Sequence, residues 1–502
     1  MNHRPKTSKE LCFTIRKYTH ECSTFLYTKP LVREIKTYTG LRDLSLSDPI
    51  SRFYHLLPQF YYLNKICKLF SCLRNLKHLG LKIESETYLQ IISKINSCQR
   101  VLDSLETLKV LFHCPQEGED AKLLKNLIMY KNILKSTTYL DVACTGSQAS
   151  HEICLQLLTD CPKLTYLYFE EVPSRDNEPF TMLTEDPSCF SALKNLNSLR
   201  TLEITVYKTW HFLRDFILPP SVQDVQLRFL SFDKPTFDST DILPIFMNFC
   251  EKWNEIKLNS LKILFNQKLD KSELVTLFLE SLLQRIKSTR ALSIQLTPQG
   301  VFSKFRKLFL KNRNQIDLSS FFDSIKHFGN TLESLSLLDY ETRYSMKNLP
   351  EQPLTFNSLQ QLILQGFMPQ EGHINRLFET NLRDLTTVED KNPLVVSLRE
   401  LEFDSVESFM GFLQIFDQEN FVRRPLSVDI YAYIKGSLAG NPSWKAYKKS
   451  FKLFSRNLIL EFIVETKFEF LKDAHFKSEF IKSLQNLEFE EDNRAQWALV
   501  PR

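Results

Sequence analysis

Cysteine and histidine side chains near the start of the chain come closest to a metal-binding arrangement. Cys12, His20 and Cys22 are neighbours in the sequence, and Cys67 and Cys72 follow further on. Protein zinc sites use thiolate and imidazole ligands, but these residues match none of the usual ligand spacings. Two other close pairs are Cys98 with Cys114 and Cys154 with Cys161. We interpret all of these thiols as reduced structural groups, and we expect neither a metal ion nor a cofactor.

Enzyme motifs are absent from the sequence. It contains no phosphate-binding G-x-x-x-x-G-K-[ST], no dinucleotide-binding G-x-G-x-x-G, no metalloprotease H-E-x-x-H and no hydrolase G-x-S-x-G. The 10 histidines are scattered, and none is visibly paired with a nucleophile. The sequence therefore predicts a non-catalytic protein without a small-molecule substrate.

Tyrosine and charged residues flank short apolar alternations and could form a binding surface. Tyrosine and arginine favour protein contact sites. Carboxylates at matching positions of neighbouring strands would lie roughly 5 Å apart, and a basic partner would relieve their repulsion. The early and middle candidates are Tyr139, Tyr166, Tyr168, Glu170, Arg228 and Lys262. The late, acidic candidates are Glu400, Glu402, Asp404, Asp429, Glu461, Glu488 and Glu490. The alternative for both sets is an ordinary solvated strand face.

Basic residues are concentrated at the N-terminus. They include Arg4, Lys6, Lys9, Arg16 and Lys17, while the whole chain has a net charge of only +5. Clustered basic side chains bind phosphate groups, so contact with nucleic acid is one interpretation. The other is a solvated cap. Residues 303–315 predict a basic amphipathic helix, for which the charged outer side of a repeat array is the favoured explanation.

A repeated leucine pattern supplies the elements that would position these side chains. Residues 161–172 contain L-x-x-L-x-F, with Leu164, Leu167 and Phe169 apolar, and residues 152–160 before them form an amphipathic run. About fifteen copies of this pair follow one another at a mean spacing of roughly thirty residues. Further copies are Leu76/Leu79/Leu81, Leu105/Leu108/Val110, Thr137/Leu140/Val142, Leu398/Leu401/Phe403 and Pro425/Val428/Ile430.

Each copy predicts one strand and one helix. The L-x-L core alternates with a period of two, as in a strand with one buried face. Segments such as residues 273–283 have the apolar spacing of three and four that is typical of a helix. Because one strand and one helix cannot bury both apolar faces alone, stacked copies would form a continuous parallel sheet backed by helices.

These leucine sets resemble the leucine-rich repeat family, especially its long-repeat, ribonuclease-inhibitor-like and F-box-associated kind. The resemblance covers residues 41–489 and implies an α/β solenoid, a curved horseshoe with parallel strands on its concave face and helices on its convex face. The family usually has asparagine or cysteine three residues after the last strand leucine, bonded to the turn backbone. Here those positions hold Glu84, His113, Thr145, Val172 and Tyr207. We therefore expect an irregular solenoid whose turns are satisfied by other groups.

The predicted organisation has three parts. Residues 1–40 form an N-terminal basic cap segment, residues 41–490 the solenoid of about fifteen irregular repeats, and residues 491–502 a C-terminal tail. The last four residues, Leu-Val-Pro-Arg, resemble a thrombin recognition sequence and are interpreted as the remnant of a cleaved tag, with a natural tail as the alternative. No apolar run is long enough to span a membrane, and no secretory signal is visible. These features predict an intracellular protein, cytoplasmic or nuclear.

The sequence favours a protein-interaction scaffold or adaptor in a larger intracellular assembly. A rigid array would present a long concave surface, and its acidic late strands would bind a basic protein segment. The alternative is a subunit of a ribonucleoprotein or chromatin complex, with the basic N-terminus touching nucleic acid. A third hypothesis, an adaptor for ubiquitin transfer, rests on the family resemblance alone.

Overall fold

The computed structural model describes part of the 502-residue chain. The described ranges are 43–46, 76–83, 92–93, 95–113, 125–145, 156–172, 193–206, 216–229, 244, 247–265, 272–296, 316–317, 319–339, 344–345, 356, 358–365, 394–403, 426–434, 446–454, 458–467 and 498–499. The chain forms two compact units, Met1–Asp224 and Val225–Arg502. The predicted basic cap, the basic helix at 303–315 and the three N-terminal cysteine and histidine residues lie outside the described residues.

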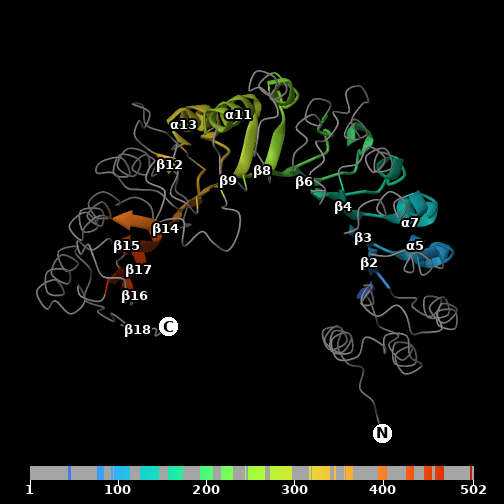
Figure 1. The fold of residues 1–502 in the computed structure, drawn as a ribbon, viewed down its shortest axis with the longest axis horizontal. Helices are drawn as coiled ribbons and strands as arrows, with labels where there is room; N and C mark the ends of the chain where they lie inside the picture. Colours follow the sequence, from blue (N-terminus) through green and yellow to red (C-terminus); the bar gives the residue numbers. More distant parts are fainter. Residues whose placement is uncertain are drawn as a thin grey trace, which may run out of the picture. The chain divides into compact units, whose positions relative to one another are not determined.

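The first unit is built on a parallel sheet whose strands follow the order of the sequence (Figure 1). The strands are β1 (Asp43–Leu46), β2 (His78–Ile83), β3 (Thr107–His113), β4 (Tyr139–Thr145), β5 (Tyr166–Val172) and β6 (Thr201–Val206). Short helices α5 (Gln99–Ser104) and α7 (Lys131–Ser136) precede β3 and β4 and lie side by side on one face of the sheet. This alternation of strand and helix with parallel pairing is the predicted arrangement of a repeat solenoid.

Leucine spacing explains the core of this unit. Leu79 pairs with Leu108, and Leu167 pairs with both Leu140 and Leu202 on its two neighbours. Each of these five leucines is almost completely buried. Because alternate side chains of a strand point to opposite faces, the leucines form one apolar layer against the helices, where Leu102, Ile133 and Leu134 are also buried. The intervening residues are left on the other face of the sheet.

The register between β3 and β4 corrects the alignment expected from the sequence. The leucine pattern matched Leu108 with Leu140, but Leu140 pairs with Val110, and Val142 pairs with Phe112. Strand β3 has buried residues at three alternate positions, so a shift of two residues keeps the same face buried. This shift decides which outward-facing residues become neighbours.

Asn96 provides a link between repeats that the leucine pattern does not show. Its Oδ1 accepts hydrogen bonds of 3.1 Å from the backbone N–H groups of Asn132 and Ile133, in the first turn of α7. The Asn132 side chain donates in return to the carbonyl oxygen of Asn96, also at 3.1 Å. The N-cap residue of α7, Tyr130, makes no side-chain cap bond of its own. A side chain from the preceding repeat therefore caps this helix.

The second unit continues the strand-and-helix pattern. Its described parallel strands are β8 (Lys257–Phe265), β9 (Ser288–Leu296), β11 (Ser334–Asp339), β13 (Gln361–Gln365), β14 (Leu394–Phe403), β15 (Leu426–Ile434) and β17 (Leu458–Lys467). Helices α11 (Ser272–Arg285) and α13 (Ser319–Ile325) pack against each other, and the 3-10 helix η2 (Lys326–Phe328) follows α13. Strand β7 (Asp224–Phe229) spans the division between the units. A separate two-stranded sheet joins β10 (Ile316–Asp317) to β12 (Tyr344–Ser345).

Aromatic residues fill the space between β8 and α11. The Phe229 ring stacks on Phe265 with 5.3 Å between centroids, and the Phe278 ring of α11 meets Phe265 edge-on. Phe249 and Trp253 lie 5.4 Å apart in the same region, and both are fully buried. These distances between ring centroids lie in the range that is usual for edge-to-face and offset aromatic pairs. These aromatic side chains therefore form the core between β8 and α11.

Two features of the last strands depart from the expected repeat. Strand β16 (Ala446–Phe454) runs antiparallel to β17, and β18 (Ala498–Leu499) runs antiparallel to β16. In β14, the register shifts between Leu398 and Leu401, and Ile430 pairs with Leu398 and not with Phe403. The leucine pattern aligned Phe403 with Ile430, so its alignment at residues 398–403 was wrong by five residues. The copy expected near residue 484 lies outside the described residues.

Candidate functional site

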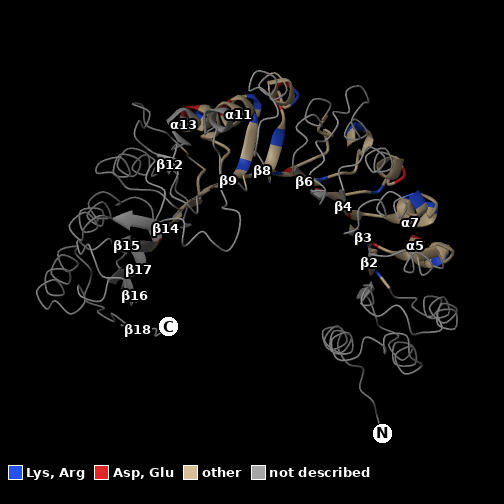
Figure 2. Ribbon diagram, in the orientation of Figure 1, with Lys and Arg blue, Asp and Glu red and all other residues tan. Residues whose placement is uncertain are grey.

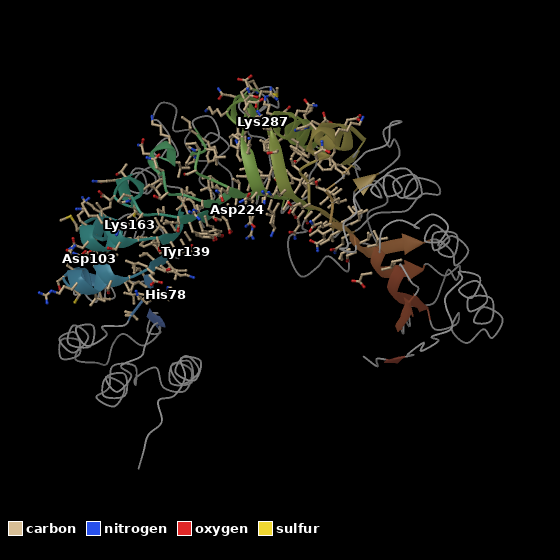
Figure 3. All side chains as sticks on the ribbon, turned by 180° about the vertical axis from the view of Figure 1, so that it is seen from behind. His78, Asp103, Tyr139, Lys163, Asp224 and Lys287 are labelled. Carbon is tan, nitrogen blue, oxygen red and sulfur yellow. The ribbon has the colours of Figure 1, made fainter. Side chains whose placement is uncertain are left out.

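The sheet face of the first unit that lies opposite helices α5 and α7 carries a well-defined group of polar and aromatic side chains. Register pairing places Lys109 on β3, Tyr139 on β4, Tyr166 on β5 and Thr201 on β6 in one row across the sheet. Asp141, Tyr168 and Glu203 form the next row, and Glu170 the one after it. Figure 3 shows Tyr139 and His78 on this side of the strands and Asp103 of α5 on the opposite, helix side. We call the surface formed by Lys109, Tyr139, Asp141, Tyr166, Tyr168, Glu170 and Glu203 the tyrosine face.

Two tyrosine rings form the centre of the tyrosine face. The rings of Tyr139 and Tyr166 are stacked with 4.1 Å between centroids and an interplanar angle of 4°. Parallel strands place register partners roughly 4.8 Å apart, so two flat rings on adjacent strands can lie against each other. The Lys109 Nζ lies 5.0 Å from the centroid of the Tyr139 ring, within the range of a cation–π contact. In this row a cation is therefore followed by two stacked rings.

Hydrogen bonds hold the tyrosine hydroxyls. The Tyr166 hydroxyl donates to Glu203 Oε1 at 2.6 Å, and the Tyr168 hydroxyl donates to Glu170 Oε2 at 2.9 Å. The buried Thr205 hydroxyl donates to the Tyr168 oxygen at 3.4 Å. Charged acceptors make shorter and stronger hydrogen bonds than neutral ones. These contacts fix the rings in place, and a surface that is already ordered loses little conformational entropy on binding.

The phenols of Tyr139 and Tyr166 stay neutral at neutral pH. Burial raises the pKa of Tyr166 above its ordinary value of 10.0, and the hydrogen bonds to Glu203 and Tyr139 raise it further. Burial is also the main cause of the raised pKa of Tyr139, and the charges of Asp141 and Glu203 add to it. A phenolate beside carboxylates would be repelled by them. At neutral pH the tyrosine face therefore offers rings and hydroxyls with three carboxylates and one lysine.

The structure brings four of the predicted contact residues together. Tyr139, Tyr166, Tyr168 and Glu170 are all half-buried on the tyrosine face, in the positions that the strand alternation predicts. Sequence reasoning missed Lys109 and Glu203. Lys109 becomes the neighbour of Tyr139 through the two-residue register shift at β3 and β4. Glu203 occupies an outward-facing strand position, and this position was the signal that could have identified it.

The predicted residues of the second unit are more dispersed. Lys262 on β8 is half-buried beside Ser293, and Arg228 on β7 is half-buried (Figure 2 shows Lys and Arg in blue). In the strand register, Asp429 pairs with Glu461, and Glu461 pairs with Lys452 of β16. The expected neighbour of Asp429 in β14 was Glu402, but the register places Ser397 there and Glu402 beside Tyr433. This part of the acidic alignment was therefore wrong.

Several predicted residues cannot be placed by their side chains. The structure describes Glu400, Glu402 and Glu461 by backbone alone. Residues outside the described part of the chain are Asp404, Glu488, Glu490, Arg4, Lys6, Lys9, Arg16 and Lys17.

Cysteines and acidic residues form no metal site in the described part of the chain, where no group of three or more potential ligands comes together. The described cysteines Cys98, Cys161 and Cys250 form no disulfide bond. Burial raises the pKa of both Cys161 and Cys250 to about 12. These two thiols are therefore part of the apolar core.

No helix within the described ranges is both long and apolar enough to cross a membrane.

Comparisons with known proteins show only distant likeness of structure. No protein-family model matches the sequence, and no curated protein matches it. Among solved structures, the chain is similar to one from the yeast Rad7–Elc1 complex, with 12% identity, 87% of each chain covered and a TM-score of 0.34. It is also similar to a protein from Bacteroides fragilis, with 13% identity, 67% of this chain and 83% of that chain covered, and a TM-score of 0.28. Scores this low carry no information about function.

Proposed function

We propose that this chain is a non-catalytic scaffold that binds a protein partner on the tyrosine face. The observation that carries this proposal is the stacked and hydrogen-bonded pair Tyr139 and Tyr166. Tyrosines with ordered rings and polar edges dominate many protein interfaces, because they bury a large area at little cost in side-chain entropy. Three carboxylates against one lysine favour a partner with a basic segment.

We also propose that the repeats are of the leucine-rich type. Support comes from the burial of the predicted positions, since Leu164, Leu167 and Phe169 are all buried and the equivalent residues of neighbouring strands pair in register. The asparagine or cysteine of the usual turn is missing, and one described link between neighbouring repeats is the hydrogen bonding of Asn96 to the start of α7. The curvature of the array stays a prediction.

Acidic residues of the last strands are a second part of the proposed binding surface. Asp429 is exposed on β15 and pairs in register with Glu461 of β17, so two acidic residues occupy adjacent strand positions. Neutralising Glu400, Glu402, Asp404 and Glu488 should weaken binding of a basic partner if this region takes part. Unchanged affinity in a folded variant would remove this region from the proposed interface.

The test of the tyrosine face compares matched variants in affinity capture from cells that express the protein. The face variant is Tyr166→Ala with Tyr168→Ala, and the control is Met129→Ala, a large side chain 72% exposed on the helix side. Both variants are first checked for cooperative unfolding. A protein partner held by the wild type and the control, and weakened by the face variant, supports the proposal. Equal capture by all three proteins contradicts it.

A nuclease arm distinguishes the alternative function. A subunit of a ribonucleoprotein or chromatin complex would lose its partners when the bound nucleic acid is digested, and deleting residues 1–36 would reduce the salt-dependent binding. Partners that survive digestion and depend on Tyr166 and Tyr168 support the protein scaffold. We expect the second result, because the tyrosine face carries more carboxylates than basic groups.

A further inference from the structure

We infer that the tyrosine face contains a subsite for an arginine side chain of the partner, between Tyr166 and Glu203 and above Thr201. This inference rests on the proposed function and specifies the chemistry of the partner segment. Three observations support it: the order of the row, the size of Thr201, and the position of the Glu203 carboxylate.

The order of the row shows one cation already bound to the stack. Lys109 lies over one face of the Tyr139 ring, and the Tyr166 ring covers the other face. The Tyr166 ring has Tyr139 on one side, and on its other side the next residue of the row, among the described residues, is Thr201. A face of an aromatic ring attracts a cation through its negative quadrupole, and arginine stacks on such faces more often than lysine. The open end of the stack is therefore chemically equivalent to the end that Lys109 occupies.

Thr201 leaves that end accessible. It is the register partner of Tyr166 on β6 and the next residue of the row, and it is half-buried. A threonine side chain is too short to cover a tyrosine ring. A flat guanidinium group could lie against the outer face of the ring, above the threonine methyl group, at the spacing that neighbouring strands impose.

Glu203 supplies the matching charge. Its Oε1 accepts the Tyr166 hydroxyl at 2.6 Å, so the carboxylate stands at the edge of the ring. A carboxylate has acceptor capacity for more than one donor. A guanidinium group that stacks on Tyr166 could donate to the same carboxylate, and its planar fork suits this geometry better than an ammonium group. Asp141 and Glu170 add negative charge on the neighbouring strands.

Charge complementarity selects the occupant. The tyrosine face has three carboxylates and a single lysine, so an extended basic protein segment with at least one arginine fits it better than an acidic or neutral segment. Nucleic acid would meet these carboxylates with its phosphates, and the like charges would repel. Arginine, stacked and paired, is the side chain that uses both the ring and the carboxylate.

The experiment uses the full-length protein and three labelled peptides of the same length, which alternate glycine with arginine, lysine or citrulline. Citrulline keeps the shape of arginine without its charge. Fluorescence anisotropy gives Kd at about 0.15 M salt, where long-range attraction is screened beyond roughly 8 Å. We expect the arginine peptide to bind roughly three- to tenfold more tightly than the lysine peptide and the citrulline peptide to bind weakest.

Variants assign this preference to the subsite. Tyr166→Leu should weaken the arginine peptide roughly fivefold to thirtyfold and remove its advantage over lysine. Glu203→Gln should weaken both cationic peptides. Thr201→Leu, which fills the open end while keeping Tyr166 and Glu203, should also remove the arginine preference. The control is Glu106→Gln, the same charge change at an exposed residue paired with Lys77 at 2.9 Å, and it should keep the preference.

Two results would overturn the subsite. One is equal binding of the arginine and lysine peptides, or no binding of either, by a folded wild-type protein. The other is an arginine preference that survives both Tyr166→Leu and Thr201→Leu. Either result can occur while the double tyrosine variant still loses its cellular partner, and in that case the scaffold function stands without an arginine subsite. Loss of the scaffold function shows instead as unchanged capture by the double variant.

Discussion

The Tyr166 hydroxyl donates a hydrogen bond of 2.6 Å to Oε1 of Glu203 on the neighbouring strand. The two residues are not register partners, because Tyr166 pairs with Thr201 and Glu203 pairs with Tyr168. The bond therefore runs diagonally between β5 and β6. One face of the Tyr166 ring stacks on Tyr139 of β4. Tyr166 is held from two strands, and its ring is an ordered part of the surface.

Removing the Tyr166 hydroxyl should lower the stability of the protein as well as the order of the ring. Tyr166→Phe keeps the ring and deletes the donor, so we expect the free energy of unfolding to fall by about 1 kcal/mol. Urea denaturation near neutral pH measures the change. Glu203→Gln combined with Tyr166→Phe should cost less than the sum of the two single changes, because the two groups interact. Full additivity would show that the bond contributes nothing to stability.

Alkaline pH should weaken the first unit through the same residues. Burial raises the pKa of Tyr166 and of Tyr139 above 10.0. Above that pH the unfolded chain releases these protons while the folded chain keeps them, so the free energy of unfolding falls as pH rises. Below that pH the two phenols contribute no pH dependence to the free energy of unfolding. Tyr166→Phe should have a shallower alkaline decline than wild type, and identical slopes would contradict the raised pKa.

The leucine spacing predicted the architecture of the described repeats well. Leu79, Leu140, Leu167 and Leu202 occupy the buried strand positions that the pattern assigned to them. Burial is a property of the strand face, and a period of two in the sequence reports it directly. The same alternation placed Tyr139, Tyr166 and Tyr168 on the other face.

The leucine pattern could not predict the register between strands. A shift of one residue exchanges the two faces of a strand and is excluded by burial, but a shift of two preserves them. In β3, Leu108, Val110 and Phe112 are all buried, so the sequence offers two equivalent alignments with β4. In β14 the error has another cause, because the strand is irregular between Leu398 and Leu401, and Ser397, five residues before the expected Glu402, pairs with Asp429. Contacts across strands, including that of Lys109 with Tyr139, depend on this choice.

Asn96 should be important for stability although it lies outside the leucine pattern. Its side-chain oxygen accepts two backbone hydrogen bonds at the start of α7. Asn96→Ala leaves these donors without that acceptor and should lower the free energy of unfolding by about 1–2 kcal/mol, as loss of an N-cap does. Asn254→Ala, at an exposed turn residue, is the matched control and should cost well under about 0.5 kcal/mol. Equal effects would mean that Asn96 does not cap the helix.

Buried thiols should resist alkylation. The pKa of Cys161 and of Cys250 is raised to about 12, so at pH 8 their thiolate fraction is on the order of one in ten thousand. Since the thiolate is the reactive form, iodoacetamide should modify the partly exposed Cys98 before either of them. Peptide-resolved mass spectrometry reads each site, and urea should remove the difference. Rapid modification of Cys161 in the folded protein would contradict its burial.

The open end of the tyrosine stack can be tested without any partner. Thr201→Arg introduces a guanidinium group beside the outer face of Tyr166 and near the Glu203 carboxylate. We expect the free energy of unfolding to rise by about 0.5–1 kcal/mol, the usual range for an exposed cation–π contact. Thr201→Lys has the same charge and a poorer fit, so its gain should be smaller.

A double-mutant cycle isolates the contact from other effects of the new side chain. In a Tyr166→Leu background the gain from Thr201→Arg should disappear, because the ring is gone while the strand position and the net charge are unchanged. The Thr201→Arg single variant should also lose its preference for the arginine peptide over the lysine peptide, since its own guanidinium group occupies the subsite. A gain in stability of the same size with and without the Tyr166 ring would instead mean that the new side chain stabilises β6 without contacting the ring. The open end of the stack would then have no affinity for arginine.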